Sequence, residues 1–215
     1  MTLTRRQIIE RMTCHDGHHG HHGIGPIAGD HALNPDMALP AGTLTPAAVL
    51  IALVERRGAF NVLLTRRTDH LEHHPGQISF PGGHMDASDS SHEACALREL
   101  EEETGIPATS VTITGRLGLY TTRTGFAVTP VVGFLELPFD LRPDPREVAE
   151  VFEVPLDFLM DEVNHQRINR EIDGKARHYY AIPFENHYIW GATAGMLVNL
   201  RAILAGEYKP GEPKR

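Results

Sequence analysis

One stretch of the chain decides the fold: Phe80-Pro-Gly-Gly-His-Met-Asp-Ala-Ser-Asp-Ser-Ser-His-Glu-Ala-Cys-Ala-Leu-Arg-Glu-Leu-Glu-Glu-Glu-Thr-Gly-Ile106. Its second half has the start and stop signals of a helix. Ser90 and Glu93 have the Ser-x-x-Glu spacing of a capping box, and Gly105 is placed to end the helix. The stretch therefore predicts a loop that leads into one strongly marked helix.

Three glutamates of this helix share a face. Glu99, Glu102 and Glu103 lie at i, i+3 and i+4, so their carboxylates converge and repel one another. Solvent that screens a polar face is the usual explanation, and a cation among the carboxylates is the other. The glycines of the preceding loop would let backbone groups approach the same face closely. Carboxylates, a carbonyl and waters suit Mg²⁺ or Mn²⁺, whereas zinc would need histidine or cysteine at ligand spacing.

Apolar runs on both sides of this stretch predict strands. Residues 46–54 and 60–65 are rich in β-branched and aliphatic residues, and the polar segment 55–59 between them is typical of a hairpin connection. Further strands are expected at 111–114, 117–121, 127–135 and 147–154. A final helix is expected at 193–205, with Thr193 as its cap, and a short amphipathic helix at 2–13. The pattern as a whole predicts an α/β fold.

Composition excludes several classes of protein. Twenty-eight acidic against 20 basic residues, a formal charge of −8, argue against a protein that neutralises many nucleic-acid phosphates. No apolar run approaches the roughly 20 residues of a membrane span, and the first residues lack the apolar core of a secretory signal. Cys14 and Cys95 are read as free thiols of a reducing compartment, so the cytoplasm is the expected location.

A histidine-rich segment follows the first predicted helix. Residues 15–22 hold five of the 14 histidines among glycines, a composition that favours a solvated loop and that could also chelate a transition metal. Residues 24–45 are rich in Gly, Pro and Ala and are typical of an irregular connection. We therefore expect an extension at 1–45, a catalytic domain at 46–208 and a tail at 209–215.

The second half of the opening stretch resembles the signature of the Nudix hydrolases. That signature is Gly, five residues, Glu, seven residues, and Arg-Glu-U-x-Glu-Glu-x-Gly-U, where U is a bulky aliphatic residue. Its second half is matched in full by Arg98, Glu99, Leu100, Glu102, Glu103, Gly105 and Ile106. Counted from Gly83, the acidic position falls on Asp89, with eight residues rather than seven before Arg98.

The resemblance implies an α/β/α sandwich with a mixed β-sheet and an enzyme that needs Mg²⁺ or Mn²⁺. It implies that Glu99 and Glu103 are the principal metal ligands, that Glu102 assists, and that the Gly82 carbonyl contributes. It also implies that Arg98 orients a glutamate through a salt bridge. The partner is a small-molecule diphosphate, with no nucleic acid and no membrane, and a homodimer is left open.

Residues 63–83 resemble the stretch found upstream of this signature in the coenzyme A pyrophosphatase branch. Thr68 replaces its Ser and Glu72 replaces its second Arg, which reverses a charge, whereas Arg67 keeps its place. Residues 189–197 resemble the closing helix of the same branch. The resemblance implies hydrolysis of coenzyme A to 3′,5′-ADP and 4′-phosphopantetheine, or its acyl form. The implied substrate-binding residues are Arg67, Gly76, Phe80, Gly83 and Arg123.

The sequence leaves the identity of the general base open. Glu102, Glu147 and Glu150 are candidates, and the last two could equally be solvent-facing strand residues; the expected catalytic set is Glu102, Glu103, Arg98 and Glu150. Trp190 and Phe126 could stack on adenine, although a core position is commoner for Trp190, and Cys95 is expected in the core.

The sequence also leaves open functions other than coenzyme A hydrolysis. A Nudix enzyme for ADP-ribose, NADH or a nucleotide sugar would differ in its pocket rather than in its chemistry. A ligand sensor with this fold would not need all three glutamates, and a metal-storage protein built on residues 15–22 is more distant.

Overall fold

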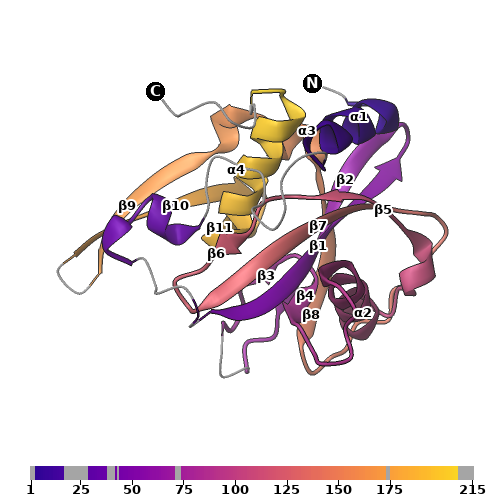
Figure 1. The fold of residues 1–215 in the computed structure, drawn as a ribbon, viewed down its shortest axis with the longest axis horizontal. Coiled ribbons are helices and arrows are strands. Elements are labelled where there is room, and N and C mark those ends of the chain that lie inside the picture. The colour runs from indigo at the N-terminus through magenta and orange to yellow at the C-terminus, as the bar shows by residue number, and fades with distance from the viewer. Residues whose placement is uncertain are drawn as a thin grey trace.

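The computed structural model describes residues 3–16, 29–37, 42, 44–70, 74–172 and 175–207. An eight-stranded sheet forms its centre, and a three-stranded sheet stands beside it (Figure 1). The central sheet contains β1 (Thr45–Arg56), β2 (Ala59–Arg67), β3 (Ile78–Ser79), β4 (Gly82–His84), β5 (Val111–Arg116), β6 (Tyr120–Thr121), β7 (Phe126–Leu135) and β8 (Val148–Pro155). The smaller sheet contains β9 (Gln166–Ile172), β10 (Lys175–Phe184) and β11 (His187–Trp190).

The central sheet is mixed, as predicted. β1 pairs antiparallel with β2 and β4 and parallel with β7. The connection between β1 and β2 is the expected hairpin, whose turn is Arg57 and Gly58. The strand predicted at 117–121 is wrong in its first part, because regular pairing with β7 stops after Arg116 and resumes only at Tyr120.

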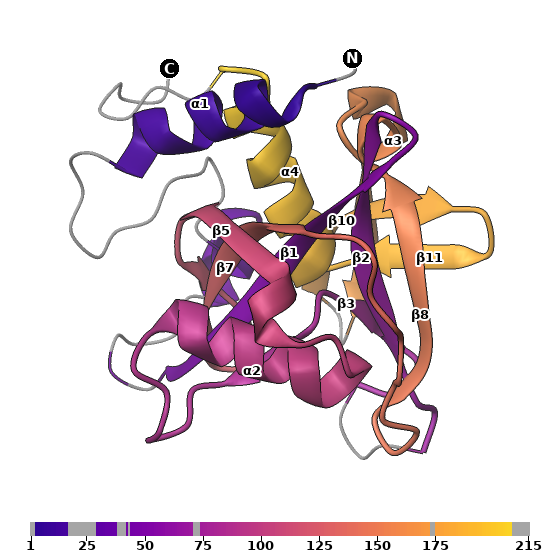
Figure 2. The ribbon, with the colours of Figure 1, turned by 90° about the vertical axis from the view of Figure 1, so that its right-hand side faces the viewer.

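Helices cover both faces of this sheet. α2 (His92–Thr104) lies on one face, and α1 (Arg5–Asp16) and α4 (Ala192–Leu204) lie on the other (Figure 2). The short α3 (Leu156–Leu159) follows β8, and single turns occur at Asp30–Ala32, Pro35–Met37, Ala108–Ser110 and Glu162–Asn164. The chain therefore has the expected α/β sandwich.

Both faces of β1 are buried, which is why its sequence is a continuous apolar run rather than an alternating one. Ala48, Leu50 and Ala52 face the core beneath α2, whereas Ile51 and Leu53 face the larger core beneath α1 and α4. Cys95 is buried in the α2 core, as expected.

The two predicted helix caps are corrected by the structure. Ser91, not Ser90, caps α2, because its extended backbone lets its hydroxyl accept a hydrogen bond from the Ala94 amide at 3.1 Å. Gly105 ends α2 with φ of 73°, as predicted. Thr193 does not cap α4: the helix begins after Gly191, and the Thr193 hydroxyl bonds the Ile78 carbonyl instead.

The N-terminal helix is present but starts later than the predicted 2–13. α1 buries Ile8 and Met12, with Leu3 beside it, because these side chains repeat at helical spacing. Residues 17–22, most of the histidine-rich segment, lie outside the described residues, as does the tail at 209–215. In the described ranges no helix is long and apolar enough to cross a membrane.

Candidate active site

Helix α2 directs two of its carboxylates toward the backbone of β4. The Glu99 side chain is 15% exposed, and its Oε1 lies 2.5 Å from where a Cβ on Gly83 would be. A side chain at position 83 would therefore displace this carboxylate. Glu103, one turn later, is 5% exposed and accepts a 3.4 Å hydrogen bond from the Thr65 hydroxyl on β2. Thr65 is a site residue that was not predicted from the sequence, although it stands two positions before Arg67 on the same strand.

Burial makes this carboxylate pair costly to ionise. Removal from water, and next the charge on Glu99, raise the pKa of Glu103 to about 8, although Arg67 acts in the opposite direction. Burial also raises the pKa of Glu99, and Glu147 adds to the negative charge felt by both glutamates. Negative charge thus gathers where a cation would relieve it.

Arg98 is the centre of an ion-pair network around the first of these glutamates. Its Nη1 lies 2.8 Å from Glu99 Oε1 and 2.9 Å from Glu102 Oε2, and its Nη2 donates to the His84 carbonyl at 3.1 Å. Arg98 therefore lies in a position to orient Glu99, the role that the resemblance implies.

Asp89 holds the other side of the same guanidinium. Its two oxygens lie 3.1 and 2.9 Å from Arg98 Nε and Nη2, and hydrogen bonds from Arg98 lower the pKa of Asp89 to about 2. The extra residue before Arg98 does not prevent this bidentate contact, because the loop ahead of α2 folds back on itself and the Asp86 amide also donates to Asp89.

Several other residues predicted from the sequence lie near the two glutamates. Arg67, at the end of β2, acts electrostatically on Glu103, and its Nε is buried without a hydrogen-bond partner. Gly83 lies against Glu99, Gly82 lies against Ala48 and Val49 of β1, and Phe80, 1% exposed, is in the core just before them. Glu102 is close to Glu99 through Arg98, and its side chain is 59% exposed.

Glu150 lies on the opposite face of the sheet from α2. It pairs across strands with Arg66, whose neighbour Leu64 faces the core beneath α4, and its Oε2 lies 3.3 Å from Arg66 Nε. Its other oxygen lies 3.2 Å from His187 Nε2, and the His187 ring stacks on Phe152 at 3.8 Å. The structure thus does not bring Glu150 to the carboxylate pair.

The other residues predicted to contact the substrate lie in turns and at the ends of strands. Arg123 is exposed in the turn between β6 and β7, where its amide donates to Asp30. Gly76 has φ of 66° in the loop after β2, and Glu72 lies outside the described residues. Trp190 is 39% exposed and packs edge-on against Tyr179, so the expected core position is wrong. Phe126 contacts the His84 ring at 5.5 Å.

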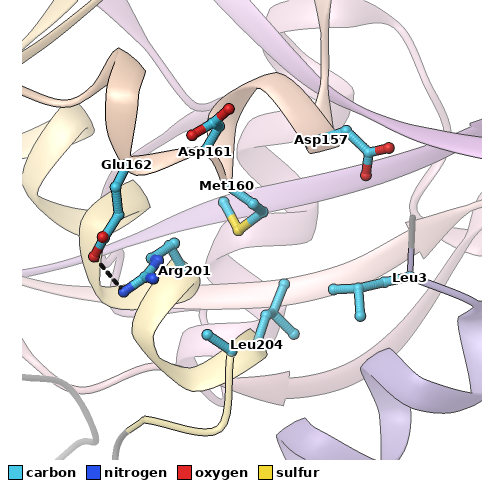
Figure 3. A pocket seen from close by; sticks show the side chains of 8 residues that line it. Leu3, Asp157, Met160, Asp161, Glu162, Arg201 and Leu204 are labelled. Atoms are coloured by element: carbon cyan, nitrogen blue, oxygen red, sulfur yellow. Dashed lines mark ion pairs between the residues drawn. The ribbon is translucent and has the colours of Figure 1, made fainter. Parts of the chain in front are cut away.

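The structure also has a pocket that other residues line. It has a volume of about 400 Å³ and lies between α3, α4 and the N-terminal segment, with Arg201 and Glu162 paired at its rim and Leu3 and Met160 in its wall (Figure 3). The candidate site residues do not line it.

The donor set fits a hard divalent cation. Within the described ranges, three or more His, Cys, Asp or Glu side chains do not form a ready-made metal cluster. Mg²⁺ nevertheless needs only one or two protein carboxylates, since waters and substrate phosphates complete its octahedron. Glu99, partly buried against Gly83, and the buried Glu103 are carboxylates that could hold such an ion.

Fold and site together define the class of protein. The sequence profile described as the NUDIX domain matches residues 44–173, more than half of the chain, so this chain belongs to the Nudix family. It is a Nudix pyrophosphohydrolase, an enzyme that hydrolyses nucleoside diphosphate derivatives.

Curated relatives carry the same family name. A protein named "Uncharacterized Nudix hydrolase NudL" from Enterobacter sp. (strain 638) is 39% identical over 168 residues, which cover 78% of this chain and 87% of the relative. Its namesake from Yersinia pestis (strain Pestoides F) is 39% identical over 154 residues, covering 72% and 77%. Among solved structures, a NUDIX hydrolase from Alicyclobacillus acidocaldarius is 17% identical with a TM-score of 0.47, covering 77% of this chain and 93% of that one.

Proposed function

We propose that this chain hydrolyses the diphosphate bond of coenzyme A and its derivatives, giving 3′,5′-ADP and 4′-phosphopantetheine or its acyl form. One observation carries the reaction type: α2 holds two neighbouring carboxylates, the buried Glu103 and the partly buried Glu99, with Gly83 against Glu99 and the charge of Arg67 acting on Glu103. The choice of coenzyme A rests on the likeness of residues 63–83 to the coenzyme A branch of the family.

Glu99 and Glu103 would hold Mg²⁺ or Mn²⁺, with Glu102 assisting and the Gly82 carbonyl as a further donor. When bound, the metal would neutralise phosphate oxygens and activate the attacking water. Arg98 keeps Glu99 in place through their 2.8 Å ion pair, and Asp89 keeps Arg98 in place. The protein thus acts mainly by positioning and by electrostatic stabilisation.

The substrate would be held by residues around the end of β2. Arg67 has a buried Nε without a partner, and a diphosphate oxygen would satisfy it. Gly76 and Gly83 would allow close approach of backbone to substrate, Arg123 would reach an outer phosphate, and Phe80, buried, would support the loop from beneath.

For the general base we propose Glu102, which is exposed beside Glu99 and free of burial. Glu150 also belongs to the expected catalytic set, and its contacts with Arg66 and His187 on the far face of the sheet weigh against it. Comparison of Glu102→Gln and Glu150→Gln by pH–rate profile separates the two, since loss of the base removes the acidic limb of kcat.

The experiment measures hydrolysis of coenzyme A, ADP-ribose and NADH with Mg²⁺ and with Mn²⁺, with products separated by chromatography. Release of 3′,5′-ADP from coenzyme A, lost in Glu103→Gln and after chelation, is the expected result. Cleavage of ADP-ribose without coenzyme A would contradict the substrate, and cleavage of none would favour the sensor.

A second candidate, a Nudix hydrolase of another nucleoside diphosphate derivative such as ADP-ribose, NADH or a nucleotide sugar, is favoured by Glu72. This residue replaces an arginine of the coenzyme A pattern and so would repel a phosphate. Glu72→Arg should then improve coenzyme A hydrolysis at the expense of ADP-ribose.

We further propose a cytoplasmic location, supported by two cysteines too few for a disulfide framework. A homodimer stays an open prediction that light scattering of the purified protein would test.

A further inference from the structure

Helix α4 begins at a position that several close contacts hold in place. The Gly191 amide donates to the Tyr180 carbonyl at 3.0 Å, and Gly195 lies so close to the Tyr120 hydroxyl that a Cβ would not fit between them. Tyr120 is itself held by Asp30 at 2.9 Å. The first turn of α4 is therefore fixed against both sheets.

One polar side chain of this turn points to the central sheet. The Thr193 hydroxyl, in a residue 6% exposed, donates to the Ile78 carbonyl at 3.1 Å. Ile78 belongs to β3, which is only two residues long and pairs with the end of β2. In Figures 1 and 2, the lower end of α4 lies beside this short strand.

The chain runs from β3 directly to the carboxylate pair. Phe80 is buried, the Pro81 carbonyl accepts from the Leu50 amide at 2.8 Å, and β4 then begins, in which Gly83 lies against Glu99. So short a strand has few ladder bonds of its own, and the Thr193 hydroxyl adds one from outside the ladder.

We propose that Thr193 is a positioning residue, which acts through Ile78 to hold the 78–83 segment where Gly83 meets Glu99. α4 lies beyond residues 44–173, the part that matches the family profile, so this assigns the C-terminal helix to the catalytic unit. The consequence for metal binding rests on the proposed function, and the effect on the 78–83 backbone does not.

The test compares Thr193→Val, which keeps the shape and removes the hydroxyl, with Thr193→Ser, which restores it. Hydrogen–deuterium exchange of the Gly82 and Gly83 amides should be about three- to tenfold faster in Thr193→Val, as expected for one lost hydrogen bond, and near wild type in Thr193→Ser. Mn²⁺ binding without substrate, followed by water-proton relaxation, should weaken by a similar factor of about three to ten, and kcat should fall more than KM changes.

Asn34→Leu provides a matched control. Asn34 is as buried as Thr193, at 6% exposed, and bonds the His178 backbone at 2.8 and 2.9 Å on β10. Its loss should lower the melting temperature without changing amide exchange at Gly82 or Mn²⁺ binding.

The inference is overturned if Thr193→Val behaves like Asn34→Leu, with a lower melting temperature but wild-type exchange at Gly82 and Gly83. It is also overturned if Thr193→Ser fails to restore the exchange rate. If wild type and Glu103→Gln bind Mn²⁺ equally poorly, the proposed metal site fails, while the exchange data still decide the role of Thr193.

Discussion

Arg98 forms ion pairs with three carboxylates at once. Asp89 occupies two of its nitrogens, and Glu99 and Glu102 share a third. A guanidinium held on two sides has little freedom to rotate, so the geometry of Glu99 depends on Asp89, which bonds Arg98 and not Glu99 itself.

Asp89→Asn should therefore lower kcat by about 10- to 100-fold, as expected for loss of a partner that orients a metal ligand. The fold should persist, because α2 keeps its caps and its buried face. Steady-state kinetics and circular dichroism check this. Asp86→Asn is the control, because that neighbouring carboxylate is exposed; equal losses in both variants would argue against the Arg98 route.

Glu103 links the pH dependence of stability to the site. Its pKa is raised from 4.5 to about 8 in the folded protein. Between these values the folded state binds a proton that the unfolded state has released, so the free energy of unfolding falls as pH rises.

For metal-free protein in chelator, urea midpoints should therefore decrease from about pH 5 to about pH 8. Glu103→Gln, which does not titrate, should flatten this decrease, and added Mg²⁺ should do so by favouring the ionised carboxylate. A slope that is identical in wild type and Glu103→Gln would show that other groups cause it.

At the scale of elements, the start of α2 sets the placement of every site carboxylate on it. The hydroxyl of Ser91 satisfies the Ala94 amide, whereas the preceding serine is exposed outside the helix. A shift of one residue would turn each side chain by about 100° around the axis.

Ser91→Ala should cost about 1 kcal/mol of unfolding free energy through the lost cap, and Ser90→Ala almost nothing. Chemical denaturation of the two variants measures the difference. Equal costs would contradict the assignment of the cap.

At the scale of the molecule, residues 29–37 join the two sheets. Asp30 bonds Tyr120 of β6, Asn34 bonds the backbone of β10, and Asp36 pairs with Arg177 at 2.8 Å. The N-terminal extension is thus a structural part of the enzyme rather than a separate unit in this region.

Replacement of His18, His19, His21 and His22 by serine should leave Mg²⁺-dependent hydrolysis unchanged, since the proposed ligands are carboxylates of α2. Steady-state kinetics with Mg²⁺ and equilibrium dialysis with Ni²⁺ separate the two roles of this segment. Loss of hydrolysis would contradict the proposed site and favour the metal-binding hypothesis.

The sequence by itself determined the elements whose signals are local. Helical spacing placed Glu99 and Glu103 on one face, the apolar run at 46–54 predicted a strand, and Gly105 marked the end of α2. Such features depend on residues within one or two turns of each other, so the printed order of residues is enough to read them.

Only the tertiary structure decided which distant residues meet. Strand register put Glu150 on the face away from α2, although its spacing in the sequence suited a base equally well. The fold of the loop before α2 brings Asp89 into contact with Arg98. The packing of α4 brings the Thr193 hydroxyl to the Ile78 carbonyl, 115 positions earlier in the chain. Pairing and burial depend on contacts between segments far apart in the chain, and these contacts have no local pattern to reveal them.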